Sequence, residues 1–390
     1  MSKLIRNILQ VFINLLHTKL TLIIAFSCGL LVSHLTSRYN SGCVENQKLH
    51  DNSYFVVVLV LSAPNNLERR NAIRETWLNL RPRIINNSFY NNEVILLPRK
   101  DTDGKIEPES VETQRLLLQK YKQWLQMETK NIKVGDYKVR HYFAIGTKNL
   151  DATTRKAVKD EQAVFNDLLL LPDLVDSYEN LTNKLLQSFV QVETQLDYNY
   201  LLKCDDDTYV KLDILSQDLL DYHQAVEKRV YPHGVDNKDA SHNQWGLYWG
   251  YFNGRAQIKT AGKWKETSFN LCDRYLPYAL GGGYVISRNL VSYLAKHHDT
   301  LNTYLSEDIT VGTWLAPFKH IHRRHDVRFD TGYKPRICRN YHLVLHKRDP
   351  NDMKQIYKND YCANEDTTSL PKEYFYDWTA APSKCCDTKA

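Results

Sequence analysis

Several common sequence patterns are absent from this chain of 390 residues. It contains no internal repeat and no low-complexity tract, which argues against repeat architectures and long disordered segments. No linker rich in proline and serine divides residues 54–390. Because 43% of the residues are hydrophobic, a sizeable core can form, and we expect that region to be one domain.

Signals of nucleic-acid or zinc binding are also missing. The formal net charge is only +6, and no module of interleaved basic and aromatic residues occurs, so we expect no nucleic-acid partner. Gly281, Gly282 and Gly283 lack the spacing of a phosphate-binding loop. Cys385 and Cys386 lack the Cys-x-x-Cys or histidine spacing that a zinc site needs.

One apolar stretch stands out near the N-terminus. Residues 20–35 follow Lys3, Arg6 and Lys19, and their 16 positions (35 − 20 + 1) are slightly short for a bilayer unless a neighbouring residue joins them. The preceding positive charge predicts a cytoplasmic N-terminus. We expect an uncleaved signal anchor, although Ser27-Cys28-Gly29 leaves a cleaved signal peptide open.

The expected organisation follows from that anchor. A cytoplasmic tail occupies residues 1–19, the anchor 20–36, a short luminal stem 37–53 and a luminal domain 54–390. The sequons at Asn86 and Asn180 agree with a secretory lumen. In an oxidising lumen most of the cysteines beyond the anchor should pair. We expect Cys204 to stay free, and Cys43 could form an intermolecular bridge.

The luminal region alternates between strand and helix patterns. Strands are expected at 54–64, 94–98, 140–147 and 199–207, and helices at 66–78, 111–127, 150–170, 179–196 and 210–226. Residues 247–259 suggest a hairpin, and 278–287 a loop leading into a strand. This alternation predicts an α/β fold with a mostly parallel central sheet, in which ligands bind at the carboxyl ends of strands.

Three consecutive acids lie at one such end. Asp205, Asp206 and Asp207 follow the hydrophobic run of 199–204, and strand alternation places Asp205 and Asp207 on one face and Asp206 on the other. If the chain turns after Asp206, Asp207 can bind a cation directly while Asp205 contacts it through water or touches a sugar hydroxyl. Oxygen ligands favour Mg²⁺ or Mn²⁺ over zinc, and such an ion suits a diphosphate.

A set of motifs extends over nearly the whole luminal region and resembles the β-1,3-galactosyltransferase family, whose members use UDP-sugars. The motifs are RRNAIRETW (69–77), FAIGT (143–147), SYENLTNK (177–184), LLKCDDDTYVK (201–211), YWGYFNGR (248–255), YLPYALGGGYVIS (275–287), SEDITVGTW (306–314) and LVLHK (343–347). With the tail YDWTAAPSKCC (376–386), they are most similar to the enzymes that build the glycosaminoglycan linkage region.

The resemblance implies a Rossmann-like GT-A fold and an inverting, Mn²⁺-dependent transfer, with Mg²⁺ as the alternative ion. It implies that Asp207 is the direct metal ligand, that Asp205 contacts the metal or ribose, and that His346 completes the metal shell. It places the general base at Asp308, with Glu307 as fallback; Ser306 and both acids also suit the start of a helix.

Further residues are candidates for substrate contact. For the donor they are Arg70, Arg74, Lys203, Asp205, Asp206, Gly281, Gly282 and Gly283. The two arginines could instead be structural ion-pair donors, and the glycines either pass close to the donor sugar or form a tight turn. Trp249, Tyr251 and Trp314 are candidates to stack on the acceptor sugar, against the alternative that they belong to the core.

The expected activity is transfer of galactose from UDP-galactose to the 3-hydroxyl of a terminal galactose on a galactosyl-xylosyl core protein. It would take place at the Golgi membrane, with association between this chain and other linkage-region transferases as a further expectation. Another donor, such as UDP-N-acetylglucosamine, is the alternative within the class. A lectin-like protein or a non-catalytic partner of a transferase is the alternative outside it.

Overall fold

The computed structural model describes residues 53–79, 110–126, 138–230, 246–359, 362 and 374–386. The expected anchor and stem, Cys43, Asn86 and the strand expected at 94–98 lie outside these residues. Within them, no helix combines the length and apolarity needed to cross a membrane.

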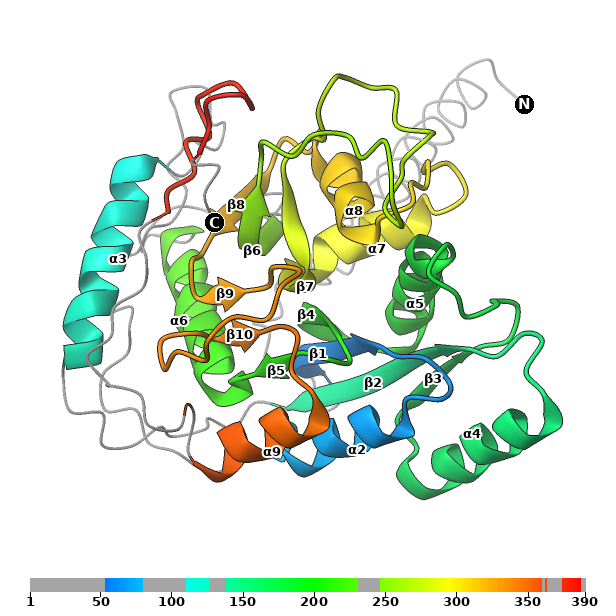
Figure 1. The fold of residues 1–390 in the computed structure, drawn as a ribbon. Helices are drawn as coiled ribbons and strands as arrows, with labels where there is room; N and C mark the ends of the chain where they lie inside the picture. Colours follow the sequence, from blue (N-terminus) through cyan, green and yellow to red (C-terminus); the bar gives the residue numbers. More distant parts are fainter. Residues whose placement is uncertain are drawn as a thin grey trace, which may run out of the picture. The chain divides into compact units, whose positions relative to one another are not determined.

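A seven-stranded sheet forms the centre of the described region (Figure 1). Its order is β3-β2-β1-β4-β7-β6-β8. The strands are β1 (Tyr54–Leu61), β2 (Val139–Gly146), β3 (Leu168–Leu171), β4 (Tyr198–Asp205), β6 (Gly246–Asn253), β7 (Tyr278–Ser287) and β8 (Ile321–His325). Only the pairs that β7 makes with β4 and β6 are antiparallel, so the expected mostly parallel α/β sheet is confirmed.

Helices cover both faces of this sheet. On one side lie α2 (Leu67–Glu75), α4 (Ala152–Phe165) and α9 (Pro350–Lys358), and on the other α5 (Leu181–Gln195), α7 (Arg288–Lys296) and α8 (Glu307–Leu315) (Figure 1). The chain steps from β1 to β2 to β3 in one direction and then returns past β1 to β4. Right-handed crossovers therefore place α2 and α4 on one face and α5 on the other. In open α/β sheets ligands bind at such a reversal, beyond the carboxyl ends of the strands, which here are those of β1 and β4.

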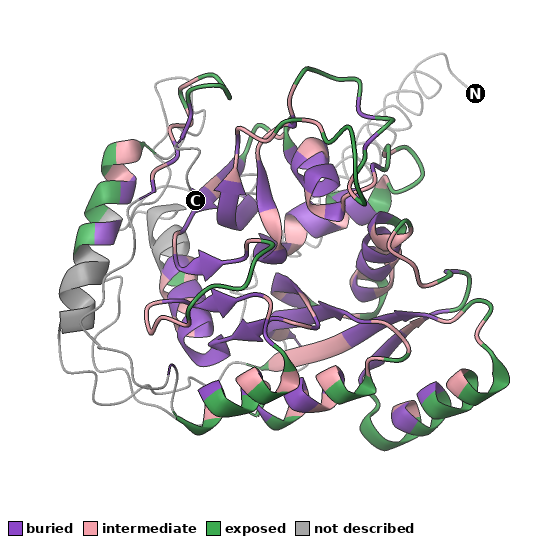
Figure 2. Cartoon of the chain, in the orientation of Figure 1, coloured by how far each residue is buried: buried purple, intermediate pink, exposed green. Residues whose placement is uncertain are grey.

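Burial follows the sequence pattern of the strands. All of β1 from Phe55 onward is buried, as expected for a β-branched run covered on both faces. Figure 2 shows most of the sheet buried, apart from the first half of β2, while the outer faces of α4 and α9 are exposed. Two further helices, α3 (Val111–Gln126) and α6 (Leu212–Val230), match the segments expected to be helical.

A second, small sheet connects distant parts of the chain. It has the order β5-β10-β9, with β5 (Tyr209–Val210), β10 (Val344–Leu345) and β9 (Phe329–Asp330). Strand β10 is antiparallel to β5 and parallel to β9. Since β5 begins two residues after Asp207 and β10 ends one residue before His346, this sheet brings the acids and the histidine together.

Three expectations about elements were wrong. The helix expected over 150–170 ends at Phe165, where Asn166 adopts a left-handed conformation, and the four leucines after it form β3. Residues 247–259 do not form a hairpin, because β6 pairs with β7 and β8 instead. The glycines 281–283 lie inside β7 and not in a loop or tight turn.

The cysteines are partly paired. Cys338 is bonded to Cys362, and Cys385 to its neighbour Cys386. Cys204 is free and buried in β4, as expected, and the exposed Cys272 is also free.

Candidate active site

The three acids lie at the switch point of the sheet. Asp205 is the last residue of β4 and stands in register with Leu61, the last residue of β1. The chain then turns through Asp206 and Asp207 before β5 begins. This is the turn that lets Asp205 and Asp207 approach a common point.

His346 completes a group that could hold a metal. One ligand atom from each of Asp205, Asp207 and His346 lies within 4.8 Å of the others. The Nε2 atom of His346 is 3.0 Å from Asp207 Oδ1 and 3.4 Å from Asp205 Oδ2. The three residues predicted from the motifs are therefore brought together.

The histidine is oriented as a metal ligand would be. Its Nδ1 lies 2.9 Å from the carbonyl oxygen of Gly332, and a proton on Nδ1 would leave the Nε2 lone pair facing the carboxylates. Nε2 is buried and makes no well-directed hydrogen bond. Burial would lower the pKa of His346, but Asp205 and Asp207 raise it to about 9. Two carboxylates around an imidazole nitrogen fit a divalent cation.

Lys203 links the metal group to the first acid of α8. Its fully buried Nζ lies 2.9 Å from Asp205 Oδ1, contacts Glu307 Oε1 and donates to the carbonyl of Gly281 at 2.6 Å. Burial would lower the pKa of Lys203, but Asp205 and Glu307 outweigh burial and raise it. Lys203 thus neutralises part of the surrounding acid and fixes two carboxylates at once. A direct contact with the donor remains a prediction.

Glu307 and Asp308 begin α8, and their side chains differ in how far they are exposed. Glu307 is 3% exposed, and its other oxygen accepts from the Tyr284 hydroxyl at 3.2 Å. Burial raises the pKa of Glu307 to about 7. Asp308 is only partly buried, and its oxygens accept from the backbone N–H groups of Gly281 and Ile309 at 2.9 and 2.8 Å. Asp308 is therefore better placed than Glu307 to meet a substrate.

The glycines of β7 explain how these groups fit together. A Cβ atom on Gly281 would lie 2.8 Å from Glu307 Oε1, and one on Gly282 would lie 2.6 Å from the ring of His346. A Cβ on Gly283 would lie 2.9 Å from Val344. The strand can therefore pass between the metal group and α8 only without side chains at these positions.

We call Lys203, Asp205, Asp207, Glu307, Asp308 and His346 the acid-rich cluster. Four of its members are carboxylates, whereas its cationic groups are one lysine and one histidine. A second group of buried charges lies beside α2, and we call Arg70, Arg74, Glu161 and Asp167 the paired cluster.

The paired cluster corrects the prediction for Arg70 and Arg74. Arg70 is fully buried and makes two bonds to Glu161, at 2.8 and 2.7 Å, besides bonds to the loop after β1. Arg74 bonds to Glu161 and, twice, to Asp167. Burial would raise the pKa of Asp167, but His141 and Arg74 lower it to about 2. Both arginines are structural ion-pair donors, the alternative that the sequence left open.

Arg69 is the arginine of α2 that faces the acids. Its Nη1 is 3.1 Å from Asp206 and 3.6 Å from Asp207, and its side chain is 39% exposed. Helical spacing does not separate Arg69 from Arg70, because Ala72 and Ile73, three and four residues after Arg69, are buried as well. On the opposite flank, Lys347 Nζ is 2.9 Å from Asp207 Oδ2.

Asp206 points away from the metal group, as strand alternation predicted. Its carboxylate accepts from Ser62 Oγ and Asn66 Nδ2, both at 2.8 Å. It therefore holds the loop after β1 against the end of β4. With its oxygens so engaged, Asp206 has a structural role here, and the predicted donor contact is not favoured.

The three aromatic candidates for the acceptor belong to the core. Trp249 is fully buried and donates to Asp326 at 3.0 Å. Tyr251 stacks on Tyr374, and Trp314 donates to the carbonyl of Asn302 at 2.7 Å. Since all three are less than 9% exposed, none offers a ring to a sugar.

Asn180 precedes α5 as its N-cap residue. Its Nδ2 donates to the carbonyl of Val175 at 3.1 Å, and the sequon threonine, Thr182, is buried and donates to the carbonyl of Tyr304. Glycosylation of Asn180 stays a prediction.

The chain is similar to known galactosyltransferases. Residues 114–326 match the family model described as Galactosyltransferase. Over 340 residues the chain is 38% identical to Beta-1,3-galactosyltransferase 6 of Mus musculus, covering 86% of this chain and 83% of that protein. Over 159 residues it is 33% identical to UDP-GalNAc:beta-1,3-N-acetylgalactosaminyltransferase 2 of Homo sapiens, covering 41% of this chain and 28% of that protein.

Among solved structures, the inositol-1-phosphate CTP transferase from T. maritima aligns with 80% of this chain and 96% of its own. The TM-score is 0.27 and the identity 10%, which carries no argument about function.

Proposed function

Because the chain belongs to the galactosyltransferase family, we propose that it transfers galactose from UDP-galactose, with inversion, to the 3-hydroxyl of a terminal galactose. The proposed acceptor is the galactosyl-xylosyl core of a proteoglycan. The mouse relative, a beta-1,3-galactosyltransferase by name, supports the donor and the linkage.

The observation that carries the proposal is that the base and the metal group contact neighbouring residues of β7. Asp308 accepts the backbone N–H of Gly281, and the ring of His346 packs on Gly282. A sugar bound against this stretch would meet a carboxylate on one side and the metal group on the other. Inverting transfer requires such an arrangement, because the nucleophile attacks opposite the leaving group.

The metal group would hold the donor diphosphate. Asp207 and His346 would bind the ion directly, and Asp205 would contact the ion or the ribose. Manganese suits this mixed set of oxygen and nitrogen ligands, with magnesium as the alternative. When bound, such an ion neutralises the negative charge that develops on the departing diphosphate.

The proposed reaction exchanges one bond for another. The acceptor O3 forms a bond to the anomeric carbon while the bond from that carbon to the β-phosphate oxygen breaks. The hydroxyl proton moves to Asp308, and the electron pair of the broken bond leaves with UDP. Glu307 is the fallback base, but its contacts with Lys203 and Tyr284 suit a positioning role better.

Two partly exposed cations, Arg69 and Lys347, flank Asp207 and are the side chains we assign to the diphosphate in place of Arg70 and Arg74. Each would exchange an acid partner for phosphate oxygens when the donor binds.

We further propose a GT-A fold, a luminal catalytic domain from residue 54 and a single N-terminal anchor at residues 20–36 in the Golgi membrane. The mixed α/β sheet with acids at its switch point supports the fold. The apolar run and the flanking positive charge support the anchor.

The test is a donor and acceptor matrix. The purified full-length chain is incubated with Mn²⁺, a galactosyl-β-1,4-xyloside and each of UDP-galactose, UDP-glucose, UDP-N-acetylglucosamine and UDP-N-acetylgalactosamine. We expect a β-1,3-linked galactose, identified by NMR, from UDP-galactose alone. Product from another donor would replace the proposed one, and no product from any donor would favour a lectin-like or assembly role.

The N-acetylated donors are included for a specific reason. The human relative that matches 159 residues is named for N-acetylgalactosamine transfer. Its match covers 41% of this chain, whereas the match to the mouse galactosyltransferase covers 86%, so galactose is the proposed sugar.

A further inference from the structure

The residues expected to stack on the acceptor are buried, but a different set of aromatic side chains lies near the base. Tyr178 precedes α5, Trp264 lies in the segment between β6 and β7, and Tyr333 lies between β9 and β10. Tyr178 and Trp264 are partly buried, and Tyr333 is 66% exposed. We call these three the aromatic rim.

The aromatic rim is continuous from residue to residue. The rings of Trp264 and Tyr333 are 5.9 Å apart and meet edge to face. The exposed Lys263 places its Nζ 4.8 Å from the ring of Trp264 and 5.5 Å from the ring of Tyr178.

One end of the rim lies beside the proposed base. Thr182, four residues after Tyr178, donates to the carbonyl of Tyr304 at 2.7 Å, and Tyr304 lies two residues before Ser306, the N-cap of α8. This hydrogen bond holds the chain around Tyr178 near the start of α8. Burial raises the pKa of Tyr178, and the charges of Asp308 and Glu307 raise it further. Its neighbour Trp264 reaches the same place from another segment.

The other end lies beside the metal group. Tyr333 directly follows Gly332, whose carbonyl lies 2.9 Å from Nδ1 of the ligand His346. The rim thus extends from the side of the proposed base to the side of the proposed metal ion. The acceptor hydroxyl must meet the base, with the donor sugar between it and the metal ion, so an acceptor sugar lies towards the end of the rim near the base.

The segment that carries Trp264 is hydrogen-bonded to the residues that precede α8. Glu266 is buried, and one of its oxygens accepts from the backbone N–H groups of Thr267 and Ser268, both at 2.8 Å. Its other oxygen accepts from the backbone N–H of Leu305 at 2.9 Å. Leu305 lies three residues before Asp308, so Glu266 fixes Trp264 relative to the base.

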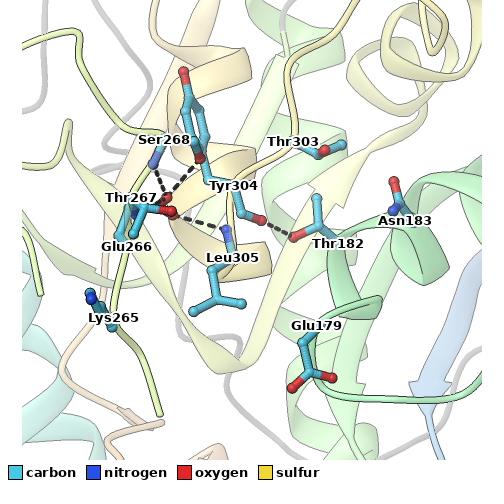
Figure 3. Close-up of a pocket in the computed structure, with 10 residues that line it drawn as sticks. All are labelled: Glu179, Thr182, Asn183, Lys265, Glu266, Thr267, Ser268, Thr303, Tyr304 and Leu305. Atoms are coloured by element: carbon cyan, nitrogen blue, oxygen red, sulfur yellow. Dashed lines mark hydrogen bonds between the residues drawn. The ribbon is translucent and has the colours of Figure 1, made fainter. Parts of the chain in front are cut away.

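A polar pocket of about 240 Å³ lies beside the bond between Glu266 and Leu305 (Figure 3). Hydroxyl, amide and charged side chains line it, among them Glu179, Asn183, Lys265 and Thr303. Figure 3 shows the bond between Glu266 and Leu305 at one side of the pocket. Most of the lining is polar, and Tyr304 and Leu305 are its larger apolar side chains.

We propose that Trp264, supported by Tyr333, is the surface on which the terminal galactose of the acceptor stacks. This proposal rests on the proposed function and adds the residue that recognises its acceptor. Galactose has one face made of C–H groups, because its 4-hydroxyl is axial, and such a face packs on an aromatic ring while the opposite hydroxyls stay solvated. In glucose the equatorial 4-hydroxyl moves the C4–H to the opposite face, so fewer C–H groups meet the ring and Trp264 favours a galactosyl over a glucosyl acceptor.

The test is steady-state kinetics of Trp264→Ala in the full-length chain with Mn²⁺ and UDP-galactose. The acceptor KM for a galactosyl-β-1,4-xyloside should rise about tenfold, the scale on which truncation of an aromatic anchor weakens binding. The donor KM and the slow transfer to water without acceptor should stay unchanged. Preference over a glucosyl-β-1,4-xyloside should fall, and Trp264→Phe should recover most of it.

The matched control is Leu271→Ala, which truncates an exposed apolar side chain of the same segment. An acceptor KM in Trp264→Ala no higher than in this control would overturn the proposal, and so would an equal rise in the donor KM. If Trp264→Ala does not fold, saturation-transfer NMR on the wild type decides. Transfer from aromatic protons to the C–H face of the galactose supports stacking, and transfer to xylose alone refutes it.

Failure of the proposed function is distinguishable from both outcomes. In that case the wild-type chain itself makes no galactosylated product. A wild type that is active, with a Trp264 variant that behaves as the control does, rejects only the stacking.

Discussion

The paired cluster and the acid-rich cluster lie near neighbouring strand ends and are built in opposite ways. In the paired cluster two arginines face Glu161 and Asp167, and each buried carboxylate has a guanidinium partner. In the acid-rich cluster Lys203 and His346 contact three of the four carboxylates, and the partly exposed Arg69 and Lys347 flank Asp207. The buried pairs of the first cluster stabilise the loop between β1 and α2, whereas the partly exposed cations of the second can exchange Asp207 for phosphate oxygens when a metal ion and the donor bind.

The first way to break this comparison is to remove the metal ligand. In Asp207→Ala we expect transfer to fall about a thousandfold or more, because the ion supplies several kcal/mol of charge stabilisation. Metal-dependent UDP binding, measured by calorimetry, should be lost as well. Asp173→Ala, at an exposed aspartate, is the control. Full activity in Asp207→Ala would remove the metal assignment.

The second way is to remove the base and keep the metal group. Asp308→Asn should lower kcat by about 10²- to 10⁴-fold, the usual contribution of a general base. UDP affinity should be unchanged, because Asp308 contacts no metal ligand. Glu307→Gln is the comparison that separates the two acids. A near-normal rate in Asp308→Asn, with a severe loss in Glu307→Gln, would transfer the role to the fallback residue.

The third test addresses the paired cluster. Arg70→Met leaves Glu161 buried without its main partner and should lower the free energy of unfolding by about 3–5 kcal/mol, measured by denaturant titration. UDP affinity should not change. Replacing Glu161 by leucine in the same chain should recover part of the stability. Weaker UDP binding at unchanged stability would restore the original donor-binding prediction for Arg70.

The fourth test asks whether the acid-rich cluster is stabilised by its ligands. At a UDP and Mn²⁺ concentration about 100 times the dissociation constant, the folded state should gain about 2.7 kcal/mol. A thermal melt should show this as a higher midpoint in the wild type and no change in Asp207→Ala. Equal shifts in both proteins would place the ligands elsewhere.

The smallest expected effect is a displaced pH profile. Burial raises the pKa of Asp308, and the base must be ionised, so activity falls as pH drops through this raised pKa. The acid limb of kcat/KM, measured at saturating Mn²⁺, should therefore lie above the range of an ordinary aspartate. A limb within the ordinary range would contradict Asp308 as the base.

Much of this arrangement could be predicted from the sequence. The β-branched run of β1 and the acids after β4 indicated a parallel sheet with its site at the strand ends, and strand alternation separated Asp206 from its neighbours. The pairing of His346 with Asp207 came from motifs alone. The small sheet that joins them has strands of two residues, too short to give a periodic signal.

Other features depend on tertiary packing that no local pattern contains. Strand β6 pairs with β7, which begins 25 residues after β6 ends (278 − 253), so the hairpin expected from neighbouring residues was wrong. Trp249 and Trp264 have the same side chain, but only the first lies on a central strand and is buried. Residue type alone could not distinguish these two.

The three glycines of β7 bear on how inherited variation in this chain should be interpreted. Any single-base change that replaces a glycine by another amino acid adds at least one carbon atom to its side chain. At residues 281–283 that atom would collide with Glu307, the ring of His346 or Val344. Missense variants at these glycines should therefore be grouped with those of the catalytic acids and the histidine, although a glycine carries no chemistry of its own.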